Sequence, residues 1–200
     1  MSTSANALRL RNLRTLALLA ALFFLPLAIA FWTYYGTGWR PSAHVNHGEL
    51  INPPVALPLV SLQPAMSGEP VPASQLRRKW SLVYVGNGDC NRDCRHALYV
   101  MRQVRLALNN QMSRIERIFL VTGGCCDRQF LRTEHAGLAV LDATSETGVR
   151  LLSGFPRGPW DQSLFVVDPL GNLMMRYDVR RDPKGLLEDL KKLLSLSHIG

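Results

Sequence analysis

The residues best suited to chemistry in this chain are Cys90 and Cys94, in the segment GNGDCNRDC. They follow an apolar run, Trp80 to Val85, and stand where a long amphipathic helix is predicted to begin. Free backbone N–H groups and the positive end of a helix dipole stabilise a thiolate at such a position. Four-residue spacing puts both thiols on one helical face, with Cα atoms about 6 Å apart, within reach of a disulfide. The pair is a candidate redox dithiol or a pair of soft ligands for Cu(I), and the alternative is two inert thiols or a local disulfide that orders a loop.

A second pair, Cys125 and Cys126, follows two glycines at the end of the next predicted strand. In a strand, helix, strand unit, the carboxyl ends of both parallel strands open on the same edge of the sheet, where α/β proteins place their sites. We therefore expect the second pair to approach the first, where it would resolve a disulfide or add thiolate ligands to a metal. The alternative is two incidental thiols in a turn, because adjacent cysteines do not readily bridge each other.

The elements that must position these cysteines form one supersecondary unit. The β-branched and aromatic residues of Trp80–Val85 predict a buried strand, bounded by glycines. Residues 91–109 carry apolar side chains at helical spacing and predict a helix of about five turns. Ile118–Val121 predicts a second buried strand. Strands this close in sequence, joined by a helix, form a right-handed parallel crossover.

The remaining pattern completes an α/β domain. A short amphipathic segment at 128–135 precedes a strand at 138–141, and two apolar runs, 163–167 and 173–177, flank a sequence typical of a type I turn, Asp168-Pro169-Leu170-Gly171. These runs predict a β-hairpin, and Lys184–Leu196, with leucines on one face, predicts a closing helix. This order describes a thioredoxin-like α/β sandwich, a central mixed sheet flanked by helices.

The N-terminus has the features of a membrane anchor. Residues 15–35 carry no charge and are long enough to cross the roughly 30 Å hydrocarbon core of a bilayer. Three arginines precede this run and aromatic residues end it, which predicts that the N-terminus stays in the cytoplasm and the rest is exported. A cleaved signal peptide, with Ala28-Ile29-Ala30 as the small-x-small site, is the main alternative, and a mitochondrial presequence is a third.

Composition and charge divide the chain and exclude some functions. Of 23 Lys+Arg, the three before the apolar run belong to the orientation signal, which leaves 20 against 15 Asp+Glu. Such a dispersed surplus does not favour nucleic-acid binding. Four cysteines are too few for a disulfide scaffold. We expect a cytoplasmic segment at 1–14, a transmembrane anchor at 15–35, a proline-rich spacer at 36–58 and a thioredoxin-like domain at 59–200.

The stretch from Leu59 to Arg105, with LVSL, GEPV, SQLRRKWSLVYVG and then CxxxC before a long helix, resembles the Sco/SenC/PrrC proteins. The hairpin LFVVDPLGNLMMRY resembles theirs too, and CRHALYVMRQVRLALNNQMSRIERIFLVT is similar to a divergent Sco-like subgroup of proteobacterial membrane proteins. The resemblance implies a single-pass protein of the bacterial inner membrane whose periplasmic domain assists assembly of the copper A centre of cytochrome c oxidase. It implies that Cys90 and Cys94 match the family's two thiol ligands for copper. The implied partner is the oxidase subunit that carries the copper A site, or another assembly factor.

Two departures from the family pattern concern the metal site. Family members usually have proline after the second cysteine, where this chain has Arg95. They also have a histidine ligand nine residues before the hairpin-turn proline, where this chain has Trp160. The Cys2His copper site is therefore incomplete, and we expect His96 and His135 to be surface residues rather than ligands.

Three functions follow from these observations. The dithiol would bind and transfer Cu(I), or it would act as a thiol-disulfide oxidoreductase on the oxidase or on other exported proteins, with Cys90 attacking and Cys94 resolving the mixed disulfide. In the third, the domain is an assembly scaffold without metal or chemistry at the cysteines. The missing histidine shifts weight from the first function toward the other two.

Overall fold

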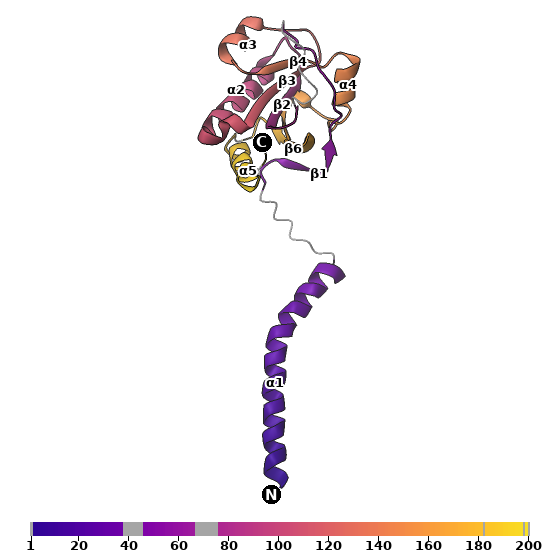
Figure 1. Cartoon of the computed structure of the whole chain (residues 1–200), viewed down its shortest axis with the longest axis vertical. Coiled ribbons are helices and arrows are strands. Elements are labelled where there is room, and N and C mark those ends of the chain that lie inside the picture. The colour runs from indigo at the N-terminus through magenta and orange to yellow at the C-terminus, as the bar shows by residue number, and fades with distance from the viewer. Residues whose placement is uncertain (1, 38–45, 67–75, 182, 198, 200) are drawn as a thin grey trace. The chain divides into compact units, whose positions relative to one another are not determined.

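The computed structural model describes residues 2–37, 46–66, 76–181, 183–197 and 199, in two compact units, 1–44 and 45–200. The first unit contains helix α1 (Ser2–Phe31), which continues into one π-helical turn, Trp32–Gly36 (Figure 1). Residues Arg11–Gly36 are long and apolar enough to cross a membrane, as an anchor or a signal sequence. The predicted span of 15–35 lies within this helical stretch.

The second unit is built on a six-stranded sheet in the order β1-β6-β5-β2-β3-β4. Strands β2, β3 and β4 are parallel, whereas β5 is antiparallel to β2, and β6 is antiparallel to both β5 and β1. The strands are β1 (Glu49–Ala56), β2 (Trp80–Gly86), β3 (Ile115–Val121), β4 (Ala139–Asp142), β5 (Ser163–Val167) and β6 (Asn172–Asp178).

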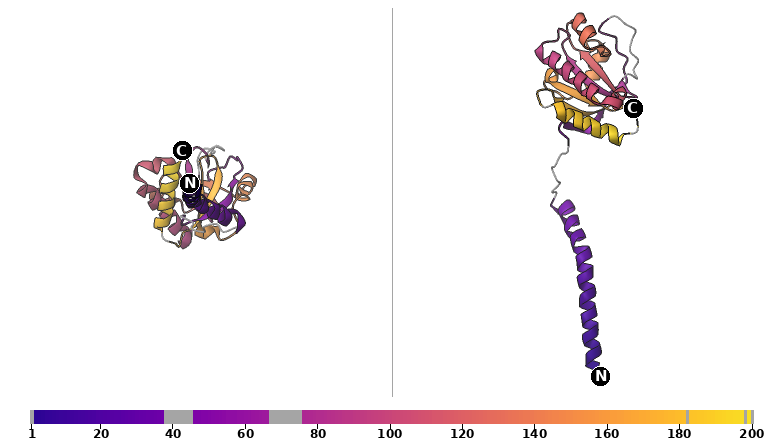
Figure 2. Two further views of the ribbon diagram at one scale, coloured as in Figure 1. Left: turned by 90° about the horizontal axis from the view of Figure 1, so that it is seen from below. Right: turned by 90° about the vertical axis from the view of Figure 1, so that its left-hand side faces the viewer.

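Helices cover both faces of this sheet. They are α2 (Arg92–Ala107), α3 (Arg128–Glu134), α4 (Glu146–Leu152) and α5 (Pro183–Leu196), with short 3-10 turns at Asn109–Arg114 and Trp160–Gln162. Helices α2 and α5 lie side by side on one face (Figure 2), and α4 packs against the other. Every residue of β2 is buried: Leu82 and Tyr84 point into the cluster under α2 and α5, and Val83 and Val85 into the cluster under α4.

The elements with strong sequence patterns are confirmed. The strand, helix, strand unit, the strand at β4, the β5–β6 hairpin and the closing helix all form. The hairpin turn closes through a 2.9 Å hydrogen bond from the Gly171 N–H to the Asp168 carbonyl, and Gly171 has the positive φ, +88°, that glycine adopts without cost. Helix α4 was not predicted. It begins where the Ser145 hydroxyl accepts a hydrogen bond from the Gly148 N–H.

The predicted spacer at 36–58 is wrong in its second half, because β1 forms there. Strand β1 pairs with β6, with Glu49 opposite Arg176 and Val55 opposite Leu173. Its prolines, Pro53 and Pro54, fall where the register shifts between Leu50 and Val55. A sheet tolerates proline at such an irregularity of an edge strand, since no ladder hydrogen bond is lost. Residues 38–45 of the spacer lie outside the described residues.

A buried carboxylate holds the start of this strand. Asp189 of α5, only 5% exposed, accepts hydrogen bonds from the backbone N–H groups of His47 (2.8 Å) and Gly48 (2.9 Å). The His47 ring adds a contact of 3.1 Å from Nδ1 to the same carboxylate. A buried acid must be satisfied in this way, so the folded domain begins before residue 59.

His135 is buried, 3% exposed, so the expectation of a surface residue is wrong. The turn after α3 brings its ring edge-on to Phe130, with ring centroids 4.8 Å apart. Burial, followed by the nearby charges of Arg117 and Arg102, lowers the pKa of His135 to about 4. His96 is exposed, as expected.

This shift makes stability depend on pH in one direction. Below its ordinary pKa of about 6.5, the unfolded His135 takes up a proton that the folded chain does not, so stability falls as pH drops from about 6.5 to about 4. The loss amounts to about 3 kcal/mol. Urea unfolding of the full chain in detergent should show this slope, and the variants His135→Phe and His135→Gln should flatten it. His96→Gln is the matched control and should keep it; equal slopes in all four proteins would contradict the assignment.

Candidate functional site

Cys90 and Cys94 lie at the junction of β2 and α2, where the sequence places them. Asn91 caps the helix, since its side-chain oxygen accepts a 3.0 Å hydrogen bond from the Cys94 N–H. Cys90 takes a left-handed backbone conformation, φ +47°, that turns the chain from strand to helix. The two cysteines are joined by a disulfide, with Cα atoms 5.0 Å apart. The spacing therefore permits the intramolecular bridge expected of it.

This disulfide is buried rather than exposed. Cys90 and Cys94 are each 2% exposed and belong to the apolar cluster beneath α2 and α5. Tyr84 shares that cluster and points its hydroxyl at the Asp161 carbonyl, 3.2 Å away. Burial, then the charges of Asp161 and Asp93, raise the pKa of Tyr84 far above its usual value, so the phenol stays neutral. Tyr84 therefore contributes no negative charge beside the cysteine pair.

Cys125 and Cys126 follow β3 and are joined to each other in a vicinal disulfide. The expectation that adjacent cysteines do not bridge is not met. Cys125 is exposed, with Sγ 3.3 Å from the Ala65 carbonyl oxygen, and Cys126 is partly buried against the cluster that holds Cys90 and Cys94. The solvent-accessible sulfur therefore belongs to the second pair.

The two cysteine-bearing loops are in direct contact. A Cβ atom added to Gly88 would lie 2.3 Å from the Gly124 carbonyl oxygen and 2.8 Å from the Cys125 Cα, so only glycine fits there. Next to it, the Asp89 carboxylate lies 3.4 Å from the position that a Cβ of Gly124 would take. The shared carboxyl edge of β2 and β3 brings the loops together, as expected from the parallel crossover.

Arg95, where the resembling family has proline, ties the two loops to each other. Its Nε lies 3.3 Å from the Cys90 carbonyl, to which it donates, and its Nη2 donates at 2.7 Å to the Asp127 carboxylate. Asp127 directly follows Cys126 and caps α3 by accepting from the Phe130 N–H at 3.1 Å. The guanidinium also sits 4.2 Å from the centre of the Phe130 ring, a cation–π contact. Sequence reasoning noted Arg95 only as a departure and missed this role.

Trp160, which stands where the family histidine is expected, does not join the dithiol. It packs against the apolar cluster on the α4 side of the sheet, and its Nε1 donates to the Pro156 carbonyl at 2.7 Å. The exposed His96 places Nε2 3.2 Å from the Val179 carbonyl. Over the part of the chain that the structure describes, no group of three or more His, Cys, Asp or Glu side chains could hold a metal ion.

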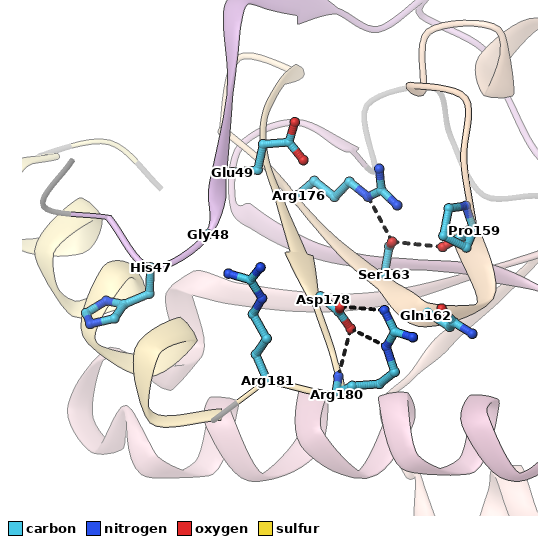
Figure 3. Close-up of a pocket in the computed structure, with 10 residues that line it drawn as sticks. All are labelled: His47, Gly48, Glu49, Pro159, Gln162, Ser163, Arg176, Asp178, Arg180 and Arg181. Carbon is cyan, nitrogen blue, oxygen red and sulfur yellow. Dashed lines mark hydrogen bonds and ion pairs between the residues drawn. The ribbon is translucent and has the colours of Figure 1, made fainter. Parts of the chain in front are cut away.

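A polar pocket of about 210 Å³ lies elsewhere, where the start of β1 meets the end of β6 (Figure 3). There Arg180 binds Asp178 through two hydrogen bonds of 2.9 and 2.7 Å, which lower the pKa of Asp178 to about 2. Arg176 donates from Nε to the Ser163 hydroxyl at 2.9 Å (Figure 3). No cysteine lines this pocket, so it is separate from the dithiol.

Solved structures share this fold. Apo Sco1 from Thermus thermophilus matches with a TM-score of 0.60 at 20% identity, over 76% of this chain and 99% of that chain. Copper-bound yeast Sco1 matches with a TM-score of 0.58 at 15% identity, over 78% of this chain and 95% of that chain. Copper-bound ScoI from Bradyrhizobium japonicum matches with a TM-score of 0.52 at 17% identity, over 71% of this chain and 98% of that chain. Residues 80–197 match the family described as transmembrane-like, thioredoxin-like, C-terminal domain, whereas no curated protein matches. The predicted thioredoxin-like α/β fold is confirmed.

The contacts of Arg95 predict that its loss loosens the disulfide. Arg95→Gln should speed reduction of Cys90–Cys94 by a water-soluble dithiol, because the Cys90 carbonyl is no longer held against α3. Asp127→Asn, which keeps a capping side chain but removes the charge, should have a similar effect, and the double variant should add little to either. Each change should cost less than about 1 kcal/mol of unfolding free energy, since the ion pair is partly exposed.

Mass spectrometry after timed alkylation measures the reduction rate, with the exposed Arg132→Gln on α3 as the matched control. Reduction of Arg95→Gln at the rate of the unchanged chain would contradict this role.

Proposed function

The chain belongs to the family of transmembrane-like, thioredoxin-like C-terminal domains, and from that premise we propose that it is a membrane-anchored, Sco-like factor that assists assembly of cytochrome c oxidase through the Cys90–Cys94 dithiol. The observation that carries the proposal is the placement of this pair at the β2–α2 junction, spaced to open and close a disulfide. The likeness to Sco1 structures supports it at the level of the fold.

The chemistry best supported by this geometry is thiol-disulfide exchange. In the reduced protein, the Cys90 thiolate attacks one sulfur of a disulfide in the partner, forms a mixed disulfide and releases one partner thiolate. The Cys94 thiolate then attacks Cys90, which forms the Cys90–Cys94 disulfide and releases the second partner thiolate. Two electrons pass to the partner, and each released thiolate takes a proton from solvent. Cys90, in the turn between β2 and α2, is the attacking thiol, and the copper-ligand cysteines of the oxidase subunit are the substrate.

The second pair is assigned to the same pathway. Cys125 is exposed while Cys90 and Cys94 are buried, so an approaching thiol meets the vicinal pair first. The contact of Gly88 with Gly124 and the Arg95 bridge hold that pair against the loop that carries Cys90. In this proposal Cys125 and Cys126 resolve disulfides formed at the first pair, or add thiolates when a metal is carried.

Cu(I) is the second candidate substrate, carried as cargo. Two reduced cysteine sulfurs are the soft donors that Cu(I) prefers, so the dithiol itself fits this ion. The copper-bound forms of yeast Sco1 and Bradyrhizobium japonicum ScoI have the same fold, which supports this candidate. Trp160 stands where the resembling family has its histidine ligand, and it packs on the α4 side of the sheet, which favours disulfide exchange over copper transport.

The proposed location follows from the N-terminal helix. The apolar stretch supports an anchor in the bacterial inner membrane, with residues 1–14 in the cytoplasm and the thioredoxin-like domain in the periplasm. The partners are then the lipid bilayer, through residues 15–35, and the oxidase subunit or another assembly factor, with no nucleic acid.

The full chain in detergent should separate these functions. Reduced protein should transfer its electrons to a disulfide-bridged peptide bearing two cysteines, and Cys90→Ser/Cys94→Ser should abolish the transfer. Cys125→Ser/Cys126→Ser, the matched control, should slow the transfer without abolishing it. Thiol quantification by mass spectrometry reads out both.

Two further measurements decide between the candidates. Competition with a coloured Cu(I) chelator should show binding that the Cys90/Cys94 variant loses if copper is carried; equal weak binding by both proteins would exclude the cargo. Oxidase activity in cells that carry only the Cys90/Cys94 variant tests the scaffold. Full activity there would overturn the dithiol proposal.

A further inference from the structure

Arg117 is a buried cation in the first half of β3, whereas Cys125 and Cys126 follow the other end of that strand. Its side chain is 5% exposed. Its Nη2 donates to the Ala136 carbonyl at 2.6 Å, but Nε and Nη1 are buried without a hydrogen-bond partner. Buried guanidinium groups are normally paired, because an unpaired buried charge is strongly unfavourable. Among the described residues, the chain supplies no acceptor for these two donors of Arg117.

Arg117 is among the residues that line a cavity of about 180 Å³ rich in positive charge. Its walls include Lys79 before β2, Arg105 at the end of α2, and Glu116 and Arg117 of β3. Lys79 lies 3.5 Å from Glu116, so these two offset each other. The Nε of Arg105 donates a hydrogen bond to the Ile115 carbonyl at 2.8 Å. Its two Nη atoms donate no hydrogen bond to any described residue. Within the described ranges, neither guanidinium group forms an ion pair with a carboxylate.

The electrostatics of the cavity point the same way. Burial, then repulsion from Arg105 and Arg102, lowers the pKa of Arg117 below its usual value. A bound anion would offset both effects by providing an opposite charge and acceptors for the free N–H groups.

We propose that this cavity is a binding site for a small doubly charged oxyanion of the phosphate class, held between the guanidinium groups of Arg117 and Arg105. A planar guanidinium group can donate two parallel hydrogen bonds to two oxygens of a phosphate, and the charges of two unpaired guanidinium groups balance a dianion. The ligand is either free phosphate or the terminal phosphate of a small ester. The site adjoins the amino ends of β2 and β3, whereas the cysteines follow their carboxyl ends, so it is independent of the dithiol.

A purely structural Arg117 is the competing interpretation. Its Nη2 contact with Ala136 secures the turn after α3, and that contact requires no ligand. Such a role predicts no response to any anion.

The test is isothermal titration of the full chain in detergent with inorganic phosphate, glycerol 3-phosphate and acetate at constant ionic strength. We expect saturable binding of phosphate or its ester, weaker binding of acetate, and a loss of about tenfold or more in Arg105→Gln. Arg117→Lys keeps the charge but not the fork, and should lose affinity similarly. Arg150→Gln, on α4 across the sheet, is the matched control and should bind as the unchanged chain does.

Each outcome is decisive. Phosphate bound but not the ester identifies the free ion as the ligand, and the reverse identifies the ester. Absence of saturable binding, equal binding by Arg105→Gln and Arg150→Gln, or tighter binding of acetate than phosphate would overturn the proposal. Arg105 is only half-buried, so its variant gives an answer even if Arg117→Lys does not fold.

Discussion

The burial of β2 on both faces is the constraint on which the rest of this domain depends. A strand covered by helices on both sides has no solvent-facing row, so its side chains are apolar or small along its whole length. Polar and reactive groups are thereby displaced to the two ends of the strand. Cys90 and Cys94 follow its carboxyl end, and Lys79 with the arginine-lined cavity adjoins its amino end. The sheet therefore separates two chemically different sites by one strand length.

Parts of the fold that repeat a strong pattern could be predicted from the sequence alone. Continuous apolar strands, the long amphipathic α2 and the Asp-Pro-Leu-Gly turn each carry a local signal strong enough to survive folding. Strand β1 has no such signal, because its prolines conceal it and its pairing depends on β6 and on Asp189 of α5. Helix α4 spans only Glu146–Leu152, too short for its periodicity to stand out.

The site shows the same division between local and tertiary information. The position of both cysteine pairs at one edge of the sheet followed from the crossover connection, but their exposure did not, since it depends on how loops distant in sequence cover them. Arg117 carried a readable signal: in the strand IERIFLV it alternates with Ile115 and Phe119, and so occupies the buried face. Beginning that strand at Ile118 hid the signal. The contacts of Arg95 and the burial of His135 arise only from tertiary packing.

The burial of the Cys90–Cys94 pair also sets how fast it can be consumed. An attacking sulfur must approach a disulfide directly, and neither buried sulfur offers that approach while the two loops remain closed. The rate of exchange is then limited by how often the segment opens, a local free energy separate from the stability of the whole domain. Small thiols therefore meet the exposed Cys125 before they reach either buried sulfur, whereas a partner that binds and opens the loops gains access to both.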